Sequence, residues 1–337
     1  MYQMFRGLLA IVVTLAIILG AGWFVMKRPD IGYDRLESMY ASNASRFMPM
    51  GEDSRIHYRD VGPRDAPVLV LVHGFSASLH TWEPWVTDLR KDYRVLTIDL
   101  PGHGLSRCLD VSETGIPQFV EVIDQVTRNL GVDRFTVIGN SMGGHTAWSY
   151  ALAHPERLDG LVLVDASGWP KSGDEAESSP LVFKLLANPL ARRVMKDIDM
   201  TGLIRSGLED SFANPALVTD AMVERYSALS RAPCHREAIL NLMIARDDRS
   251  NASPEKLAAI TEPTLIMFGE KDNVVPAAHG EKFAAAIPGS ELKLYPDVGH
   301  LPQEEAAAQS VSDLRQFLAD RVYVVTDEAL PEAIPGE

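Results

Sequence analysis

Cysteine is scarce in this sequence, with only Cys108 and Cys234 among 337 residues. Two cysteines cannot build the framework of several disulfides that holds small secreted domains together, nor can they supply the thiolates of a structural zinc site. The sequence leaves a single bridge between them open. Two unpaired buried thiols are the commoner finding for cysteines in domains of this kind, so unpaired thiols are the expectation.

Positive charge is also scarce. Lysine and arginine number 32 against 46 aspartates and glutamates, which gives a formal net charge of -14. Such a chain repels a phosphate backbone and lacks the clustered cations that release counterions, so nucleic acid is not expected as a partner. Apolar residues make up 46% and charged residues 23%, proportions that are typical of a globular protein and exclude disordered and fibrous classes.

The only long apolar run stands near the start of the chain, from Gly7 to Met26, and contains no charge. As a helix it would span ~30 Å, which is the hydrocarbon thickness of a bilayer. A cleaved signal peptide is the competing interpretation, but its apolar stretch is usually about 7 to 15 residues long and ends in a small-x-small site. Here the run continues past residues 20–22 into Trp23 and Phe24, so we expect a retained single-pass anchor over residues 1–28. Basic residues flank both ends, which leaves the orientation open.

Short apolar runs follow a polar linker at residues 29–45. Unbroken apolar runs are typical of strands that are buried on both faces of a parallel sheet. The expected parallel strands are 68–72, 95–98, 135–138, 161–164, 264–268 and 292–295. A hairpin of Arg46–Met50 and Arg55–Arg59 is expected at an antiparallel edge. Helical patterns at 119–130, 146–153 and 304–318 alternate with the strands, which predicts a doubly wound α/β domain.

The alternation of strand and helix is interrupted once, between Asp165 and Thr264. This stretch has apolar residues at helical spacing and no convincing strand. The spacing is seen at Val182, Leu185 and Leu186 and again at Met222, Tyr226 and Leu229. We expect a helical cap that covers the catalytic end of the sheet and shapes an apolar pocket. The expected boundaries are 46–166 and 261–320 for the two parts of the core, 167–260 for the cap and 321–337 for an acidic tail.

The segment Gly139-Asn140-Ser141-Met142-Gly143-Gly144 lies between an expected strand and an expected helix. In that context a G-x-S-x-G match indicates a strained turn that exposes the serine hydroxyl as a nucleophile. A phosphate-binding turn would need G-x-G-x-x-G or a Gly-Lys-Ser ending, and this segment has neither. Ser141 is therefore the predicted nucleophile.

A serine hydroxyl needs a base, and His300 lies in the loop after the last expected strand. The base in turn needs a carboxylate that fixes its tautomer, and Asp272 lies in the loop after strand 264–268. Asp165, at the end of strand 161–164, is a rival for the same role.

Two backbone N–H groups are expected to form an oxyanion hole: that of Phe75, after strand 68–72, and that of Met142, after the nucleophile. Each donor of this kind commonly contributes ~3 kcal/mol to the stability of the transition state. This chemistry implies neither a metal ion nor an organic cofactor.

Together these motifs resemble the α/β-hydrolase superfamily from Arg55 to Leu318. The motifs are His73-Gly74-Phe75, Asp99 to Ser106 (Asp-Leu-Pro-Gly-His-Gly-Leu-Ser), Gly139 to Gly144, Asp272 and His300. The N-terminal span, followed by His-Gly-Phe-Ser-Ala and later Ser-Met-Gly-Gly, is similar to the membrane-anchored monoacylglycerol lipases and their bacterial lipase relatives. That resemblance implies a membrane-bound enzyme that hydrolyses carboxylic esters of acylglycerols or other lipid-like molecules.

Three alternatives accompany this interpretation. The nucleophile segment also resembles the carbon-carbon bond hydrolases of aromatic degradation. Those usually carry Ser-Gly-Pro-Gly after the first His-Gly and Trp after the catalytic histidine, whereas this sequence has Phe75-Ser76-Ala77 and Leu301. Haloalkane dehalogenases and epoxide hydrolases of this fold use an aspartate nucleophile, which Ser141 argues against. A binding protein without activity on the same scaffold is the third, but such proteins typically lack a member of the triad.

Overall fold

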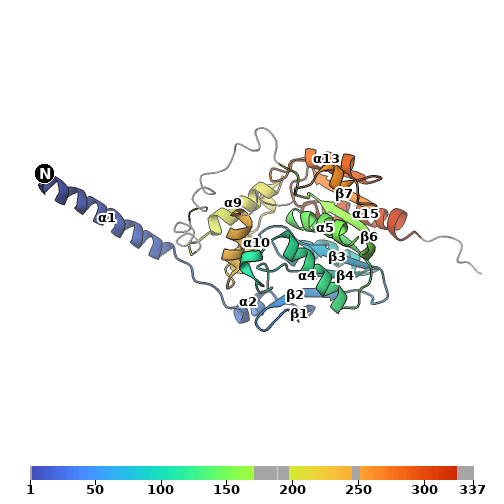
Figure 1. The fold of residues 1–337 in the computed structure, drawn as a ribbon, viewed down its shortest axis with the longest axis horizontal. Coiled ribbons are helices and arrows are strands. Elements are labelled where there is room, and N and C mark those ends of the chain that lie inside the picture. Colours follow the sequence, from blue (N-terminus) through green and yellow to red (C-terminus); the bar gives the residue numbers. More distant parts are fainter. Residues whose placement is uncertain (1, 171–187, 189–196, 245–250, 325–337) are drawn as a thin grey trace, which may run out of the picture.

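The computed structural model describes residues 2–170, 188, 197–244 and 251–324. Its centre is one eight-stranded sheet with the order β1-β2-β4-β3-β5-β6-β7-β8 (Figure 1). The strands are β1 (Ser45–Pro49), β2 (Arg55–Val61), β3 (Val68–Val72), β4 (Arg94–Ile98), β5 (Phe135–Asn140), β6 (Leu158–Val164), β7 (Thr264–Gly269) and β8 (Glu291–Tyr295). β2 pairs antiparallel with both β1 and β4, and all other pairs are parallel. The doubly wound α/β sheet with a hairpin edge is therefore confirmed.

The two faces of the sheet bury separate apolar layers, because successive side chains of a strand point to opposite faces. Val70 and Val72 belong to the layer under α4 (Ile116–Asn129), α5 (Met142–Ala153) and α13 (Ala278–Ala286). Leu69 and Leu71 belong to the opposite layer, under α3 (Glu83–Leu89) and α15 (Ala307–Phe317). All four side chains are fully buried. Burial of each such side chain contributes about 1.5–3 kcal/mol, which explains why these strands read as unbroken apolar runs.

The insertion between β6 and β7 is helical in its described part. It contains α9 (Thr201–Ser211), α10 (Asp220–Ser230), α11 (His235–Ile244) and α12 (Pro254–Leu257). Met222 and Tyr226 of α10 pack on an apolar cluster that includes Leu301, the residue after the predicted base. The predicted helical cap is therefore present. The apolar positions Val182, Leu185 and Leu186 lie outside the described residues.

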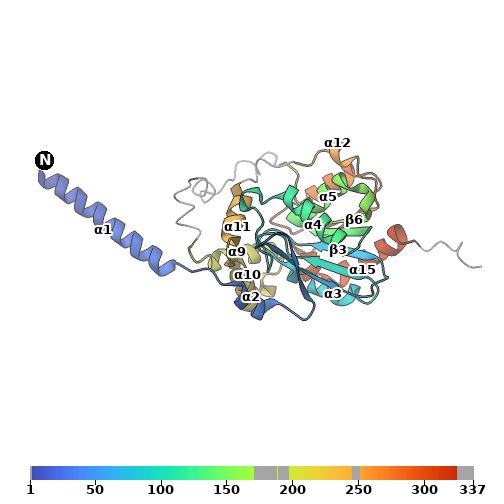
Figure 2. The ribbon, with the colours of Figure 1, turned by 60° about the horizontal axis from the view of Figure 1, so that its bottom comes forward.

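The N-terminal helix α1 (Tyr2–Met26) extends away from the body of the molecule (Figure 1, Figure 2). In the part of the chain that the structure describes, its segment Phe5–Met26 is the one helix long and apolar enough to cross a membrane, and none of it is buried. The composition and exposure of α1 are those expected of the predicted anchor.

After α1 the chain pairs with the cap rather than with the core. Lys27 forms an isolated β-bridge with Ile198, and the backbone N–H of Arg28 donates to the carbonyl of Asp197 at 2.8 Å. The expected polar linker contains a helix, α2 (Tyr33–Tyr40), whose Leu36 is fully buried among residues of the cap and the core. The chain that follows α1 therefore joins the body next to α9, α10 and α11, as Figure 2 shows.

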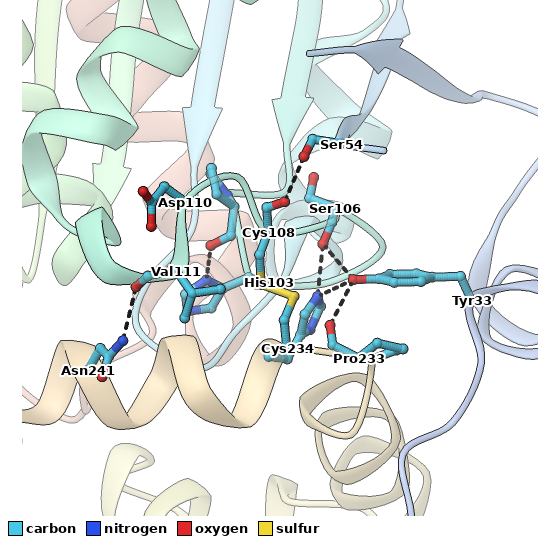
Figure 3. Close-up of a disulfide and its surroundings, with 12 residues drawn as sticks. Tyr33, Ser54, His103, Ser106, Cys108, Asp110, Val111, Pro233, Cys234 and Asn241 are labelled. Atoms are coloured by element: carbon cyan, nitrogen blue, oxygen red, sulfur yellow. Dashed lines mark hydrogen bonds between the residues drawn. A yellow bond between two sulfur atoms is a disulfide. The ribbon is translucent and has the colours of Figure 1, made fainter. Parts of the chain in front are cut away.

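Cys108 and Cys234 form a disulfide, so the expectation of two unpaired thiols is wrong. Cys108 follows β4 in the core, whereas Cys234 lies between α10 and α11 of the cap, 126 residues later. Only the folding of the cap onto the core brings them together, and their spacing in the sequence carries no sign of it. The bridge ties one end of the cap covalently to the core (Figure 3).

The C-terminal helix also differs from the expectation. Instead of one helix over 304–318 there are two, α14 (Pro302–Glu305) and α15, separated at Ala306, which has φ -124° and ψ 40°. The chain stays on the core beyond the expected start of the tail at residue 321, because the hydroxyl of Tyr323 lies 2.9 Å from Thr136 Oγ1.

Candidate active site

Ser141 occupies the sharp turn between β5 and α5. Its φ is +55°, in the left-handed region that residues other than glycine rarely adopt. The flanking glycines are required by space: a Cβ on Gly139 would lie 2.1 Å from the carbonyl oxygen of Gly143, and one on Gly143 would lie 2.1 Å from that of Val72. The backbone N–H of Ser141 donates to the carbonyl of Val164 at 3.0 Å, which ties the turn to the end of β6. The strained turn predicted from the glycine spacing is thus present.

The loop after β3 lies directly against this turn. A Cβ on Gly74 would come within 3.1 Å of the Ser141 Cβ, so the next residue, Phe75, stands beside the nucleophile. Within the described part of the chain, the backbone N–H groups of Phe75 and Met142 donate to no other group. Unpartnered N–H groups beside a nucleophile are what an oxyanion hole requires.

His300 and Asp272 lie at the ends of neighbouring strands, β8 and β7. His300 Nδ1 donates to Asp272 Oδ2 at 2.6 Å, and both residues are buried. The other carboxylate oxygen, Oδ1, accepts the backbone N–H groups of Val274 at 2.6 Å and Val275 at 2.9 Å. Three donors therefore fix the orientation of the Asp272 carboxylate, and the bond to Nδ1 directs the free Nε2 lone pair of the imidazole away from it.

Contacts from two sides hold the backbone of His300. The backbone N–H of His300 donates to the carbonyl of Ser211, at the end of cap helix α9, at 2.7 Å. Its carbonyl accepts from Asn140 Nδ2, the residue before the nucleophile, at 3.0 Å. No hydrogen bond joins Ser141 Oγ to His300 among the described residues. Catalytic hydrogen bonds often tighten only when a substrate is bound.

Glu305 was not singled out by the sequence pattern, yet it joins the cap to the histidine loop. Its carboxylate accepts the backbone N–H groups of Gly299 at 2.7 Å, Ala213 at 3.1 Å and Asn214 at 2.8 Å. Glu305 has no local signature in the sequence, because its two partners in the cap lie about 90 residues away in the chain.

Asp165 lies beside the His300–Asp272 pair. One side-chain atom from each of Asp165, Asp272 and His300 lies within 4.8 Å of the others. Burial raises the pKa of Asp165 well above its usual range, and the negative charge of Asp272 raises it further. In the described chain these three residues are also the group that could hold a metal ion. Both carboxylate oxygens of Asp272 and the Nδ1 of His300 are already engaged in hydrogen bonds.

A second buried aspartate, Asp99, supports the loop that carries Phe75. Its Oδ1 accepts the backbone N–H of Leu79 at 2.7 Å and its Oδ2 that of Leu105 at 2.8 Å. Burial acts to raise the pKa of Asp99, but the hydrogen bond and charge of His57 outweigh it and hold that pKa well below its usual range. The sequence motif around Asp99 thus stabilises the chain that follows Phe75.

The structure brings together all five residues predicted from the sequence. Ser141 and Met142 share the turn, Phe75 lies against it, and His300 and Asp272 are hydrogen-bonded at the adjoining strand ends.

Comparison with known proteins agrees with this architecture. The family described as alpha/beta hydrolase fold matches residues 67–307. A 2-hydroxy-6-oxononadienedioate/2-hydroxy-6-oxononatrienedioate hydrolase of Escherichia coli O81 (strain ED1a) is 30% identical, over 82% of this chain and 96% of that protein.

Two solved structures extend the comparison. A hydrolase from Pseudomonas aeruginosa PA01 is 28% identical with a TM-score of 0.68, covering 83% of this chain and 99% of its own. A membrane phospholipase A is 24% identical with a TM-score of 0.66, covering 93% of this chain and 97% of its own, a likeness of fold.

Proposed function

Because the chain belongs to the alpha/beta hydrolase fold family, we propose that Ser141, His300 and Asp272 form a catalytic triad that transfers an acyl group to water. The observation that carries this proposal is the hydrogen bond from His300 Nδ1 to Asp272, beside a serine held at φ +55°.

Each residue has a defined role in this reaction. Ser141 Oγ attacks the carbonyl carbon while Nε2 of His300 takes the hydroxyl proton, and Asp272 stabilises the resulting imidazolium. The N–H groups of Phe75 and Met142 bind the oxyanion. His300 then protonates the leaving group. Water, deprotonated by the same histidine, releases the acid from the acyl-serine.

The preferred substrate is a carboxylic ester of a lipid-like molecule. The exposed apolar helix Phe5–Met26 joins the cap through Lys27 and Arg28, so a membrane that holds α1 would lie next to the cap. Arg28 also forms an ion pair with Asp199 of the cap at 3.0 Å. A catalytic domain held at the bilayer surface would favour substrates that partition into the membrane.

Cleavage of a carbon-carbon bond is the second candidate, and by sequence similarity alone it has the stronger support. The E. coli relative is a hydrolase of 2-hydroxy-6-oxo dienedioates, and such a compound contains no ester bond, so its hydrolysis breaks a carbon-carbon bond. Its carboxylates would need a cation at the site.

One experiment separates the two candidates. The purified full-length protein is assayed with short- and long-chain acyl esters, with a long-chain monoacylglycerol and with a 2-hydroxy-6-oxo dienoate, with Ser141→Ala as the inactive control. We expect kcat/KM for the best ester to exceed that for the dienoate by at least ~100-fold, a ratio that buried polar groups can enforce. A higher kcat/KM for the dienoate than for every ester would reject ester hydrolysis but would remain consistent with the proposed triad.

Removal of residues 1–28 tests the role of the anchor. For a short water-soluble ester, kcat/KM should stay nearly unchanged, because triad and oxyanion hole lie in the remaining domain and tethering contributes only effective concentration. For a monoacylglycerol in vesicles the rate should fall, and detergent that disperses the substrate should reduce the loss. Equal slowing of both substrates would show instead that α1 supports the fold.

A further inference from the structure

We propose that Asp165 is a positioning residue that acts, as an uncharged carboxylic acid, by donating a hydrogen bond to Asp272 and so holding the partner of His300 in place. This inference rests on the triad of the proposed function. It also assigns a different role to the residue that the sequence suggested as a rival for Asp272.

The contacts of the two carboxyl groups decide where the proton lies. Asp272 accepts three hydrogen bonds, from Val274, Val275 and His300. Asp165 accepts one, from the backbone N–H of Gly269 to Oδ1 at 2.9 Å. Its Oδ2 is buried and accepts no hydrogen bond. Two adjacent buried carboxyl groups cannot both ionise readily, and the charge settles on the one with more donors. We therefore place the proton on Asp165, whose carboxyl group lies within 4.8 Å of that of Asp272 and whose buried Oδ2 has no other partner among the described residues.

The surroundings of Asp165 add further negative charge. The titratable groups that face it are Asp272 after β7, His300 after β8, Glu305 of α14 and Tyr295 of β8. Asp272 and Glu305 both disfavour a charge on Asp165. Within this group only His300 can become positive, and its Nδ1 proton is already donated to Asp272.

The backbone at Asp165 makes a clean test feasible. Its φ is +43°, a conformation that asparagine and glycine adopt more readily than other residues. Asp165→Asn keeps an acceptor for Gly269 and replaces the O–H donor by an N–H donor. Asp165→Gly removes the side chain without adding backbone strain. Comparison of these two variants therefore isolates the effect of the hydrogen bond to Asp272.

The readout is the rate at which a fluorophosphonate labels Ser141, because this rate does not depend on the natural substrate. Near neutral pH, Asp165→Asn should label within about threefold of the wild type, since its donor is retained. Asp165→Gly should label about 10- to 100-fold more slowly, the range for one hydrogen bond to a charged group. Asp272→Asn serves as the reference for loss of the triad acid, and melting temperatures confirm that all variants fold.

The pH profile distinguishes a held proton from a merely structural side chain. In the wild type, ionisation of Asp165 at alkaline pH removes the donor and places a second negative charge beside Asp272, so the labelling rate should fall there. Asp165→Asn cannot titrate and should lack this alkaline decline. An Asp165→Asn variant as slow as Asp272→Asn, or one that keeps the decline, would overturn the inference. Absence of any labelling of wild-type Ser141 would instead reject the triad itself.

A second observation, the disulfide, independently gives the side of the membrane. We infer that the body of the protein lies on the oxidising side, outside the cytosol, if α1 spans the membrane as proposed. Disulfides such as Cys108–Cys234 form and persist in oxidising compartments and are rare in the cytosol. The flanking basic residues left this orientation open.

The bridge lies at a junction where the linker, the core and the cap meet (Figure 3). Tyr33 of the linker donates its hydroxyl proton to the carbonyl of Pro233 at 3.2 Å. His235 Nε2 lies 2.8 Å from the carbonyl of Ser106, and Asn241 Nδ2 donates to that of Val111 at 2.9 Å. Because linker, core and cap are joined here, all three must lie on one side of the membrane.

The test uses the full chain in intact cells. Blocking free thiols before lysis should leave both cysteines unmodified until a reductant is added, and protease added outside spheroplasts should digest the body. Cys108→Ser is the control, because its single remaining thiol should react without reductant. Alkylation of both wild-type cysteines without reductant, or protection of the body from external protease, would overturn this inference.

Discussion

The molecule contains two buried His–Asp pairs that are almost identical in geometry. In one, His57 Nδ1 lies 2.7 Å from Asp99 Oδ2; in the other, His300 Nδ1 lies 2.6 Å from Asp272 Oδ2. Each aspartate also accepts two backbone N–H groups, from Leu79 and Leu105 in the first pair and from residues 274 and 275 in the second. The carboxylate and the imidazole therefore do not by themselves define an active site.

Even a serine is present at both places. His57 Nε2 lies 2.8 Å from Ser45 Oγ, which completes a Ser-His-Asp arrangement at the antiparallel edge of the sheet. That hydroxyl also accepts the backbone N–H of Ser42 at 3.0 Å, and the ring of Phe47 covers His57 at a centroid distance of 5.0 Å. Ser45 lies in strand β1, whereas Ser141 lies in a strained turn beside two unpartnered N–H groups. The difference between the two arrangements is the surroundings of the serine.

The largest expected difference is in activity, between substitution of Ser141 and substitution of Ser45. Ser141→Ala should abolish labelling by an organophosphonate and lower kcat by at least ~10³, because triad members act as a unit. Ser45→Ala, the matched control, should label normally and keep its kcat. Mapping of the label to Ser45 by peptide mass spectrometry would reverse the comparison.

Substitution of Asp272 should mainly lower activity, whereas substitution of Asp99 should mainly lower stability. Asp272→Asn should lower kcat by up to ~10⁴, because the amide favours the wrong imidazole tautomer, with a smaller change in stability. Asp99→Asn should cost about 3–5 kcal/mol of unfolding free energy, because it leaves a buried histidine without its charged partner. Denaturant unfolding and steady-state kinetics of both variants measure this. If Asp272→Asn and Asp99→Asn lost equal activity and were equally stable, the two His–Asp pairs would not be functionally distinct.

Acid should lower the contribution that the Asp99–His57 pair makes to stability. The pKa of Asp99 is held below its usual range, so its contribution to stability is present above about pH 4 and is lost as the pH falls toward the folded-state pKa. The unfolding free energy of the wild type should therefore fall on acidification below about pH 4, and that of Asp99→Asn should fall less. If the unfolding free energies of the two proteins fell in parallel with pH, the lowered pKa of Asp99 would be contradicted.

The smallest expected effect concerns Glu304, which links the two regions. Its carboxylate accepts the hydroxyl proton of Thr81, in the turn that Asp99 supports, and it follows His300 by four residues. Burial raises the pKa of Glu304 to about 7, and the hydrogen bond from Thr81 and the charge of Arg225 offset this only in part.

Because the folded-state pKa of Glu304 is raised, its contribution to stability is full below about pH 4.5 and is lost as the pH rises through about 7. Glu304→Gln should therefore be more stable than the wild type at pH 8, by about 1–3 kcal/mol, and should match it near pH 5. Thermal unfolding at both pH values measures the difference. A constant offset at both pH values would show that the glutamate does not titrate in this range.

Local pattern was sufficient for much of this molecule. Unbroken apolar runs predicted the parallel strands, because burial on both faces demands them. The glycines around Ser141 predicted the strained turn, since side chains there would collide with neighbouring backbone. The order of Ser141, Asp272 and His300 along the chain, each at the end of an expected strand, predicted which residues meet.

Tertiary structure alone decided what depends on contacts between distant segments. The sequence contains nothing that pairs Cys108 with Cys234 or joins the end of α1 to the cap at Ile198. The partners in each case are about 100 residues apart or more, and their meeting follows from how helices pack on the sheet rather than from any local periodicity. The sequence therefore determined the strands, the turn and the order of the proposed triad residues, whereas packing determined which distant segments are held together.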